Sequence, residues 1–325
     1  MPNPNKNRNM KAISTAILFL SFALASAVSG LFLPLAVAER SDKPDLIQTF
    51  PAGDSPNNLA FDGANIWVTN SGGSTVTKLR ASDGAPQGTF TVGDDPKALA
   101  FDGENIWVTC EGLHDLAKLR ASDGTMLDSF RIPFNPYGLA WDGANIWVSD
   151  EVANTVTKVQ GSDGRILGTF PVGLGSKKGV LFDGNNIWVA NYEDWSVSKL
   201  QPSDGTVLDT IPVGQRPFGL AFDGKKVWVS NSSSDSVTAI RVSDDKVFKS
   251  EFVGDSPLGI AFDGAKIWVA VSEDNTLVGL GARRGANART FDVGAYPFGV
   301  LFDGTSIWVA NALDDTVTKI TRAQP

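Results

Sequence analysis

Residues 61–68 read FDGANIWV, and this stretch decides the fold because close copies of it recur along the chain. Apart from two variable central positions, the copies differ only by Trp141 in place of Phe and Val227 in place of Ile. They follow one another at intervals of 40 or 41 residues and begin at Phe61, Phe101, Trp141, Phe182, Phe222, Phe262 and Phe302. A fixed period of this length is typical of β-propellers, so seven copies predict seven blades.

Each copy contains four short segments with strand character, separated by turn residues. Gly63 and Gly84 follow Asp in two of these turns, where glycine adopts positive φ at no steric cost. The run IWV at 66–68 is apolar at three successive positions, so both faces of that strand are buried, as they are in stacked blades. We therefore predict that the Trp of every copy belongs to the core. In the first copy the expected strands are 58–61, 65–69, 75–81 and 87–92.

The two ends of the repeat array complement each other. The last copy has residues for only three strands, whereas QTFPAG at 48–53 matches GTFTVG at 88–93, the fourth strand of the first copy. We expect the segment at 48–53 to complete the last blade and close the ring, which leaves no sheet edge open at the junction. The predicted fold class is all-β, a seven-bladed β-propeller with four-stranded blades, formed as a single domain by residues 39–325.

Residues 1–38 differ from the rest of the chain. Lys6, Arg8 and Lys11 precede a long apolar run that ends in AVA at 36–38, a small-x-small pattern typical of signal-peptide cleavage. ALA at 23–25 is a second candidate site, and an uncleaved membrane anchor is the alternative, because more than 20 apolar residues can span a bilayer. Either way we expect an exported protein in the periplasm, in the medium or at the cell surface.

Charge and composition exclude several functions. Removing residues 1–38 takes the formal net charge from −8 to −11, which argues against nucleic-acid binding. Cys110 is the single cysteine, so no intrachain disulfide can form. The sequence contains no haem motif, phosphate loop or ligand-rich cluster, and we expect no cofactor. We expect a monomer that contacts a membrane only if its N-terminal segment stays uncleaved.

The repeat resembles the YVTN-type propeller repeat. The resemblance rests on WVTN at 67–70 followed by TVT at 75–77, and on VGDDP at 92–96 and VGQRP at 213–217, and it covers residues 44–325. NHL repeats and the streptogramin lyases are similar in pattern, whereas WD40 repeats are disfavoured because no Trp-Asp pair ends the third strand. The resemblance implies an exported or surface-located propeller, in a family where many members have no known reaction.

One face of such a propeller varies from blade to blade, and we place the candidate binding residues there. This face carries the loops between the fourth strand and the next first strand and those between the second and third strands. The residue at the channel mouth is expected to be Asn57, Lys97, Tyr137, Lys178, Phe218, Leu258 or Phe298, depending on the blade. Tyr192 and Trp195 break the repeat pattern, so the core does not require them. The candidate binding set is Tyr137, Tyr192, Trp195, Phe218 and Phe298 with Lys97 and Lys178.

The last position of the second strand offers weak candidates for metal ligands. Asn70, Asn191, Asn231 and Asn311 end the second strand of their blades, with Asp150 in register. One carboxylate among four amides makes a poor hard-cation site, and we favour a structural role in tying down loop backbone. The Asp of each Asp-Gly pair is likewise better explained by turn formation than by calcium binding.

Catalytic candidates are few. Streptogramin lyases use a His base with Glu partners and Mg²⁺, yet His114 is the single His here and does not align with that motif. Lactonase-type propellers hold a metal with Glu, Asn and Asp in the channel, whereas the mouth ring here offers Asn57 and no carboxylate. Cys110 has only His114 nearby as a base.

The sequence therefore favours a non-catalytic binding or scaffold module for a protein or glycan-like ligand. The alternatives are a lyase- or lactonase-like enzyme and a structural protein of the cell surface.

Overall fold

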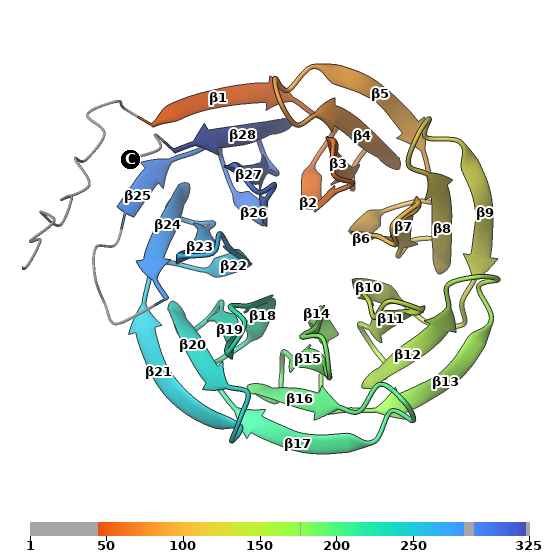
Figure 1. Ribbon diagram of the computed structural model, residues 1–325, viewed down its shortest axis with the longest axis vertical. Helices are drawn as coiled ribbons and strands as arrows, with labels where there is room; N and C mark the ends of the chain where they lie inside the picture. Colours follow the sequence, from red (N-terminus) through yellow and green to blue (C-terminus); the bar gives the residue numbers. More distant parts are fainter. Residues whose placement is uncertain (1–44, 176, 283–288, 323–325) are drawn as a thin grey trace, which may run out of the picture. The chain divides into compact units, whose positions relative to one another are not determined.

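The computed structural model describes residues 45–175, 177–282 and 289–322, which form seven four-stranded antiparallel sheets arranged in a ring (Figure 1). The four strands of each blade are named A to D from the centre of the ring outward. This confirms the predicted all-β, seven-bladed propeller. The part of the chain described contains no helix long and apolar enough to span a membrane. The predicted signal segment at 1–38 lies outside the described residues.

The strands follow the repeat, and their bounds agree with the predicted ones to within two residues in the first copy. Blades one to four comprise β2 (Pro56–Phe61), β3 (Asn65–Asn70), β4 (Thr75–Arg80) and β5 (Pro86–Thr91); β6 (Pro96–Phe101), β7 (Asn105–Cys110), β8 (Asp115–Arg120) and β9 (Met126–Arg131); β10 (Pro136–Trp141), β11 (Asn145–Asp150), β12 (Thr155–Gln160) and β13 (Ile166–Pro171); β14 (Lys177–Phe182), β15 (Ile187–Asn191), β16 (Ser196–Leu200) and β17 (Val207–Pro212). Blades five to seven comprise β18 (Pro217–Phe222), β19 (Lys226–Asn231), β20 (Ser236–Arg241) and β21 (Lys246–Phe252); β22 (Pro257–Phe262), β23 (Lys266–Val271), β24 (Thr276–Gly281) and β25 (Arg289–Asp292); and β26 (Pro297–Phe302), β27 (Ser306–Asn311) and β28 (Thr316–Thr321) with β1 (Leu46–Pro51).

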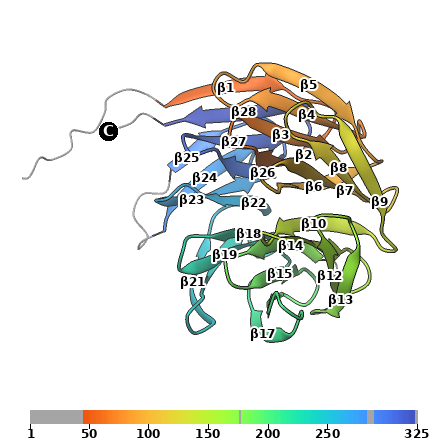
Figure 2. The same cartoon turned by 45° about the vertical axis from the view of Figure 1, so that its right-hand side comes forward.

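The N-terminal strand closes the ring as predicted. β1 pairs antiparallel with β28 from Leu46 opposite Thr321 to Pro51 opposite Thr316. Figures 1 and 2 both show β1 lying along β28 on the outer side of blade seven. The Phe50 ring lies 5.8 Å from the Trp308 ring, so the first strand contributes packing as well as hydrogen bonds. Strand D of this blade therefore comes from the opposite end of the repeat array.

Each repeated Trp is a buried core residue whose indole is tied to the Asp-Gly turn of its own blade. All seven are 0% exposed, and each Nε1–H donates to the Oδ2 atom of the turn Asp over 2.7 to 2.8 Å. In blade one, Asp62 Oδ1 also accepts the backbone N–H groups of residues 64 and 65. Gly63 adopts a φ of 96°, which completes the tight turn. The turn carboxylates are thus engaged by the protein itself.

A lysine on strand C links five of the blades to their neighbours, a feature that the sequence reading missed. The ammonium group lies 4.6 to 5.4 Å from the Trp ring centroid of its own blade. In blade one, Lys78 also donates to the backbone oxygen of Ala121 in the turn between strands C and D of blade two, over 2.6 Å. The detectable signal was the recurrence of Lys at positions 78, 118, 158, 199 and 319.

Candidate functional site

The N-terminal parts of the A strands, next to the D–A loops, surround a cavity of about 220 Å³ at the centre of the ring. Six of the seven predicted mouth residues line it, namely Asn57, Lys97, Tyr137, Lys178, Phe218 and Phe298. Lys177 pairs with Asn191 as Pro56 pairs with Asn70, so the extra residue of the 41-residue interval precedes Lys177, and Lys178 has the register of Asn57. Leu258, the seventh, is buried.

The backbone at the mouth is held by hydrogen bonds between blades. Thr109 Oγ1 on strand B of blade two donates to the backbone oxygen of Tyr137 in blade three over 2.8 Å. The hydroxyl of Thr69 donates in the same way to the backbone oxygen of Lys97 over 2.9 Å. A Cβ atom at Gly138 would overlap the backbone oxygen of Lys178, so glycine there permits the close approach of neighbouring A strands. The mouth side chains therefore project from a fixed frame.

One half of the mouth is aromatic. The Tyr137 and Phe218 rings meet edge to face with their centroids 6.2 Å apart, and Phe218 meets Phe298 in the same manner at 5.3 Å. Such edge-to-face pairs stabilise each other through the quadrupoles of the rings. The structure thus brings together three of the predicted binding residues as one apolar wall.

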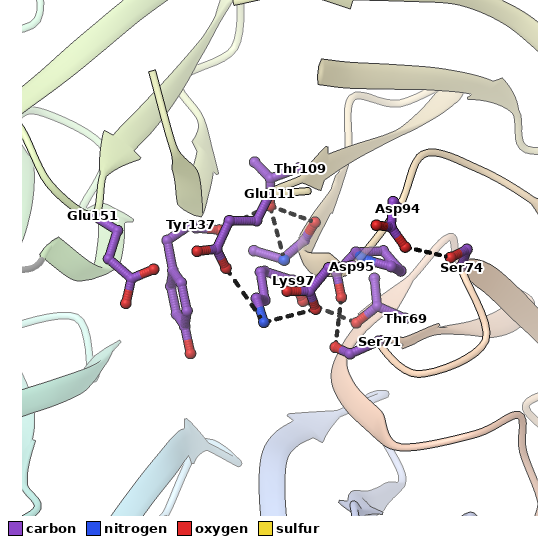
Figure 3. A network of polar contacts seen from close by, with 12 residues as sticks. Thr69, Ser71, Ser74, Asp94, Asp95, Lys97, Thr109, Glu111, Tyr137 and Glu151 are labelled. Carbon is purple, nitrogen blue, oxygen red and sulfur yellow. Dashed lines mark hydrogen bonds and ion pairs between the residues drawn. The ribbon is translucent and has the colours of Figure 1, made fainter. Parts of the chain in front are cut away.

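The other half carries ion pairs (Figure 3). Lys97 Nζ lies 2.7 Å from Asp95 Oδ1 and 3.3 Å from Glu111 Oε2. Lys178 pairs with Glu151, and its Nζ atom also lies 3.9 Å from the centroid of the Tyr137 ring. Figure 3 shows Glu111, Glu151 and Lys97 gathered around Tyr137, which therefore joins the charged half to the aromatic one.

This arrangement shifts the ionisation of its members. Burial raises the pKa of Glu111 to about 7, assisted by a hydrogen bond and charge repulsion from Glu151 and opposed by Lys97. Burial works to lower the pKa of Lys97, but hydrogen bonds and ion pairs with Asp95 and Glu111 outweigh it and raise that pKa. Burial and the neighbouring carboxylates raise the pKa of Tyr137, so its phenol stays neutral. The mouth therefore contains a carboxyl group that titrates near neutrality.

The expectation that the mouth ring has no carboxylate holds for the A strands but misses the contribution of the loops. Glu111 and Glu151 each follow the last residue of strand B and pair from there with the mouth residues Lys97 and Lys178. The corresponding residues of the other blades are Ser71, Tyr192, Ser232, Ser272 and Ala312. Two glutamates 40 residues apart, the length of one repeat, were the signal that would have identified this pair.

Tyr192 and Trp195 occupy different places. Tyr192 continues the site, since Lys178 Nζ and Arg216 Cζ lie 5.8 Å and 5.4 Å from its ring centroid. Trp195 is 48% exposed and has a φ of 53°, a left-handed conformation that is uncommon for a bulky residue. Among the described residues, no aromatic or cation contact joins Trp195 to the mouth. The structure therefore groups four of the five predicted aromatic residues.

The predicted metal candidates lie inside their own blades. Each Asn amide donates to hydroxyl groups of strand C; Asn70 Nδ2, for example, donates to Thr75 Oγ1 and Thr77 Oγ1 over 3.0 and 2.9 Å. The side chains of Asn191, Asn231 and Asn311 follow the same plan. Asp150 Oδ1 accepts the backbone N–H groups of residues 152 and 153. Within the described part of the chain, no three His, Cys, Asp or Glu side chains form a group that could hold a metal ion.

His114 occupies a position that joins neighbouring blades. Its Nδ1–H donates to the backbone oxygen of Phe134 over 2.9 Å, which fixes this tautomer because a carbonyl oxygen only accepts. Asn275 and Asp315 occupy the position of His114 in their own blades. Asn275 Oδ1 accepts the backbone N–H of Tyr296, and Asp315 Oδ1 accepts the backbone N–H of Ser55, again across a blade boundary. His114 is therefore the blade-two member of a set of structural links.

Cys110 is buried at the end of β7, and burial raises the pKa of its thiol to about 12. We expect this thiol to resist a disulfide reagent such as dithionitrobenzoate in the native protein at neutral pH, because the thiolate is the reactive form. In denaturant, one thiol per chain should react fully, and absorbance follows the reaction. Rapid labelling of the native protein would show instead that solvent reaches β7.

No protein-family model matches the chain, and no curated protein matches it in sequence. Among solved structures, it is similar to a catalytically inactive variant of virginiamycin B lyase from Staphylococcus aureus with quinupristin, at 17% identity and a TM-score of 0.75 over 86% of this chain and 100% of that one. A streptogramin B lyase matches at 18% identity and a TM-score of 0.74 over 85% and 97% of the two chains. Kuenenia stuttgartiensis hydrazine synthase matches at 18% identity and a TM-score of 0.72 over 83% of this chain and 96% of that one. At these identities the likeness establishes the fold alone: this chain is a seven-bladed propeller of the kind that streptogramin B lyases have.

Proposed function

We propose that this protein is an exported, non-catalytic binding propeller that holds a protein or glycan-like partner on the face formed by its B–C and D–A loops. One observation carries the proposal. The mouth cavity on this face is ringed by Asn, Lys, Tyr and Phe side chains at one register position, whereas the turns of the opposite face repeat the same Asp-Gly chemistry. Residues that vary over a constant scaffold are those free to serve recognition.

The surroundings of the mouth support a partner larger than the cavity. Leu113, Val152 and Leu313 in B–C loops and Leu174 in a D–A loop are all exposed, as is Trp195. Exposed apolar side chains around a concave site with aromatic anchors are typical of protein and carbohydrate recognition surfaces. A partner would rest on this rim and insert one group into the mouth.

The lyase neighbours keep an enzyme as the second candidate, because their fold is the same. The Nδ1–H of His114 donates to the backbone oxygen of Phe134, which leaves Nε2 able to accept a proton, but His114 does not line the mouth cavity. The enzyme alternative would instead require the carboxyl pair of Glu111 and Glu151 to move protons.

Affinity capture from the exported fraction tests the binding function. The bait is the chain from Glu39 onward, compared with its variant carrying alanine at Tyr137, Tyr192, Trp195, Phe218 and Phe298. We expect partners of the wild type to be lost from this variant, because truncating central aromatic anchors typically costs a factor of 10 to 1,000 in affinity, or about 1.4 to 4 kcal/mol.

The matched control has alanine at five exposed apolar residues of the D strands, Ile47, Leu127, Leu167, Leu208 and Phe248. It removes comparable apolar surface and should retain the partners. Equal capture by the wild type and both variants would refute the proposed face.

A further inference from the structure

The charged half of the mouth has an unequal number of ionisable groups of each sign. Among the groups joined by ion pairs, Lys97 and Lys178 are opposed by three carboxyl groups, those of Asp95, Glu111 and Glu151. Arg216 contacts the Tyr192 ring and forms no ion pair with these groups in the described part of the chain. The side chains of Glu111 and Glu151 are only 21% and 25% exposed, so water screens them incompletely. The cluster is therefore neutral with one carboxyl protonated and carries one net negative charge with all three ionised.

We infer that the mouth recognises an ammonium group on an apolar body, with the cation held by Glu111 and Glu151 and the body against Phe218 and Phe298. This inference rests on the proposed binding function and names the group that the partner inserts, such as a lysine side chain or an amino group of a sugar or small amine.

The geometry fits such a ligand. Both lysines are already paired with carboxylates, so a cation that enters meets a balanced or negative cluster and not a positive one. The edge-to-face rings of Tyr137, Phe218 and Phe298 give the apolar body a wall beside the charge. A cavity of about 220 Å³ accepts a group of side-chain size, and its lining residues Lys97 and Lys178 are the ones that pair with Glu111 and Glu151. The acidic chain adds a long-range attraction for cations.

Binding should be linked to the proton that the cation displaces. The titratable groups that face Glu111 are Lys97 on β6, Asp95 directly before that strand, Tyr137 on β10, Glu151 after β11 and, through Glu151, Lys178 on β14. Below about pH 7 the third carboxyl keeps its proton and competes with the cation, whereas above it the negative charge is available. Affinity for an ammonium ligand should therefore rise with pH.

Three probes of one shape test this inference on the chain from Glu39 onward: benzylammonium, benzyl alcohol and benzoate. Binding is measured by titration calorimetry or ligand-observed NMR at about pH 5.5 and about pH 8, where the amine is protonated throughout. We expect benzylammonium to bind best and to gain up to about 30-fold in affinity at the higher pH if the proton is fully displaced. Benzoate should bind weakest at both.

Glu111→Gln should remove the pH dependence and weaken benzylammonium binding about tenfold or more. The matched control is Glu104→Gln, which makes the same charge change on the opposite face of blade two. It should preserve both the pH dependence and the affinity for benzylammonium. The wild-type pH profile remains decisive even if Glu111→Gln folds poorly. Equal affinity for the amine and the alcohol, affinity that falls with pH, or no binding of any probe would overturn the inference. If the variant with alanine at the five aromatic residues still lost its partners in affinity capture, the proposed binding function would stand without the ammonium inference.

Discussion

Deletion of β1 is expected to unfold the propeller, because this strand is the fourth strand of blade seven and closes the ring. Its loss removes the ladder with β28 and the Phe50 ring from Trp308, and it exposes the edge of β28. Losing a fully buried Phe side chain typically costs about 3–5 kcal/mol and the half-buried Phe50 ring somewhat less, while each ladder hydrogen bond contributes about 1 kcal/mol. The total rivals the whole stability of a typical domain, about 5–15 kcal/mol.

Urea denaturation of chains that begin at Glu39 and at Ser55 measures this effect, with circular dichroism as the readout. The chain from Ser55 should lack a cooperative transition or have a midpoint at far lower urea. A synthetic peptide of residues 45–53 supplied in trans should restore part of the stability, because the missing element is one strand with a preformed partner. Identical midpoints for the two chains would show that blade seven is stable with three strands.

Replacement of a core Trp is expected to have the second largest effect. Trp188→Ala removes a side chain with no exposed surface and leaves the carboxylate of Asp183, itself buried, without its indole donor. A large-to-small change at such a position typically costs about 3–5 kcal/mol, and the orphaned acceptor adds to it. Chemical denaturation of wild type and variant provides the free-energy difference.

Trp195→Ala is the matched control, since the same substitution seven residues later removes a side chain that is 48% exposed. Surface substitutions usually change stability by less than about 0.5 kcal/mol. Trp188→Phe separates the two causes, because it keeps most of the apolar volume and loses only the Nε1–H donor. Comparable destabilisation by Trp188→Ala and Trp195→Ala would contradict the assignment of the repeated Trp to the core.

The sequence by itself determined the fold, the number of blades and the closing strand. The reason is that the decisive features are local and repeated: the Asp-Gly turn, the buried IWV strand and the period of about 40 residues occur within every copy. The mouth residues were predictable too, because each blade contributes one residue in the same register. The match of 48–53 to the end of the first blade identified the partner of β28 without any coordinates.

Only the tertiary structure decided the composition of the site. Lys97 and Glu111 belong to blade two, Glu151 to blade three and Lys178 to blade four, so their contacts depend on how neighbouring blades pack against each other. The pKa of Glu111 depends on burial and on Glu151, neither of which a single repeat reveals. His114 likewise reads as a free loop histidine until blade three is placed beside it and its Nδ1–H meets the backbone oxygen of Phe134. Local sequence specifies turns and strands, whereas desolvation and contacts between blades arise only when distant copies are brought together in space.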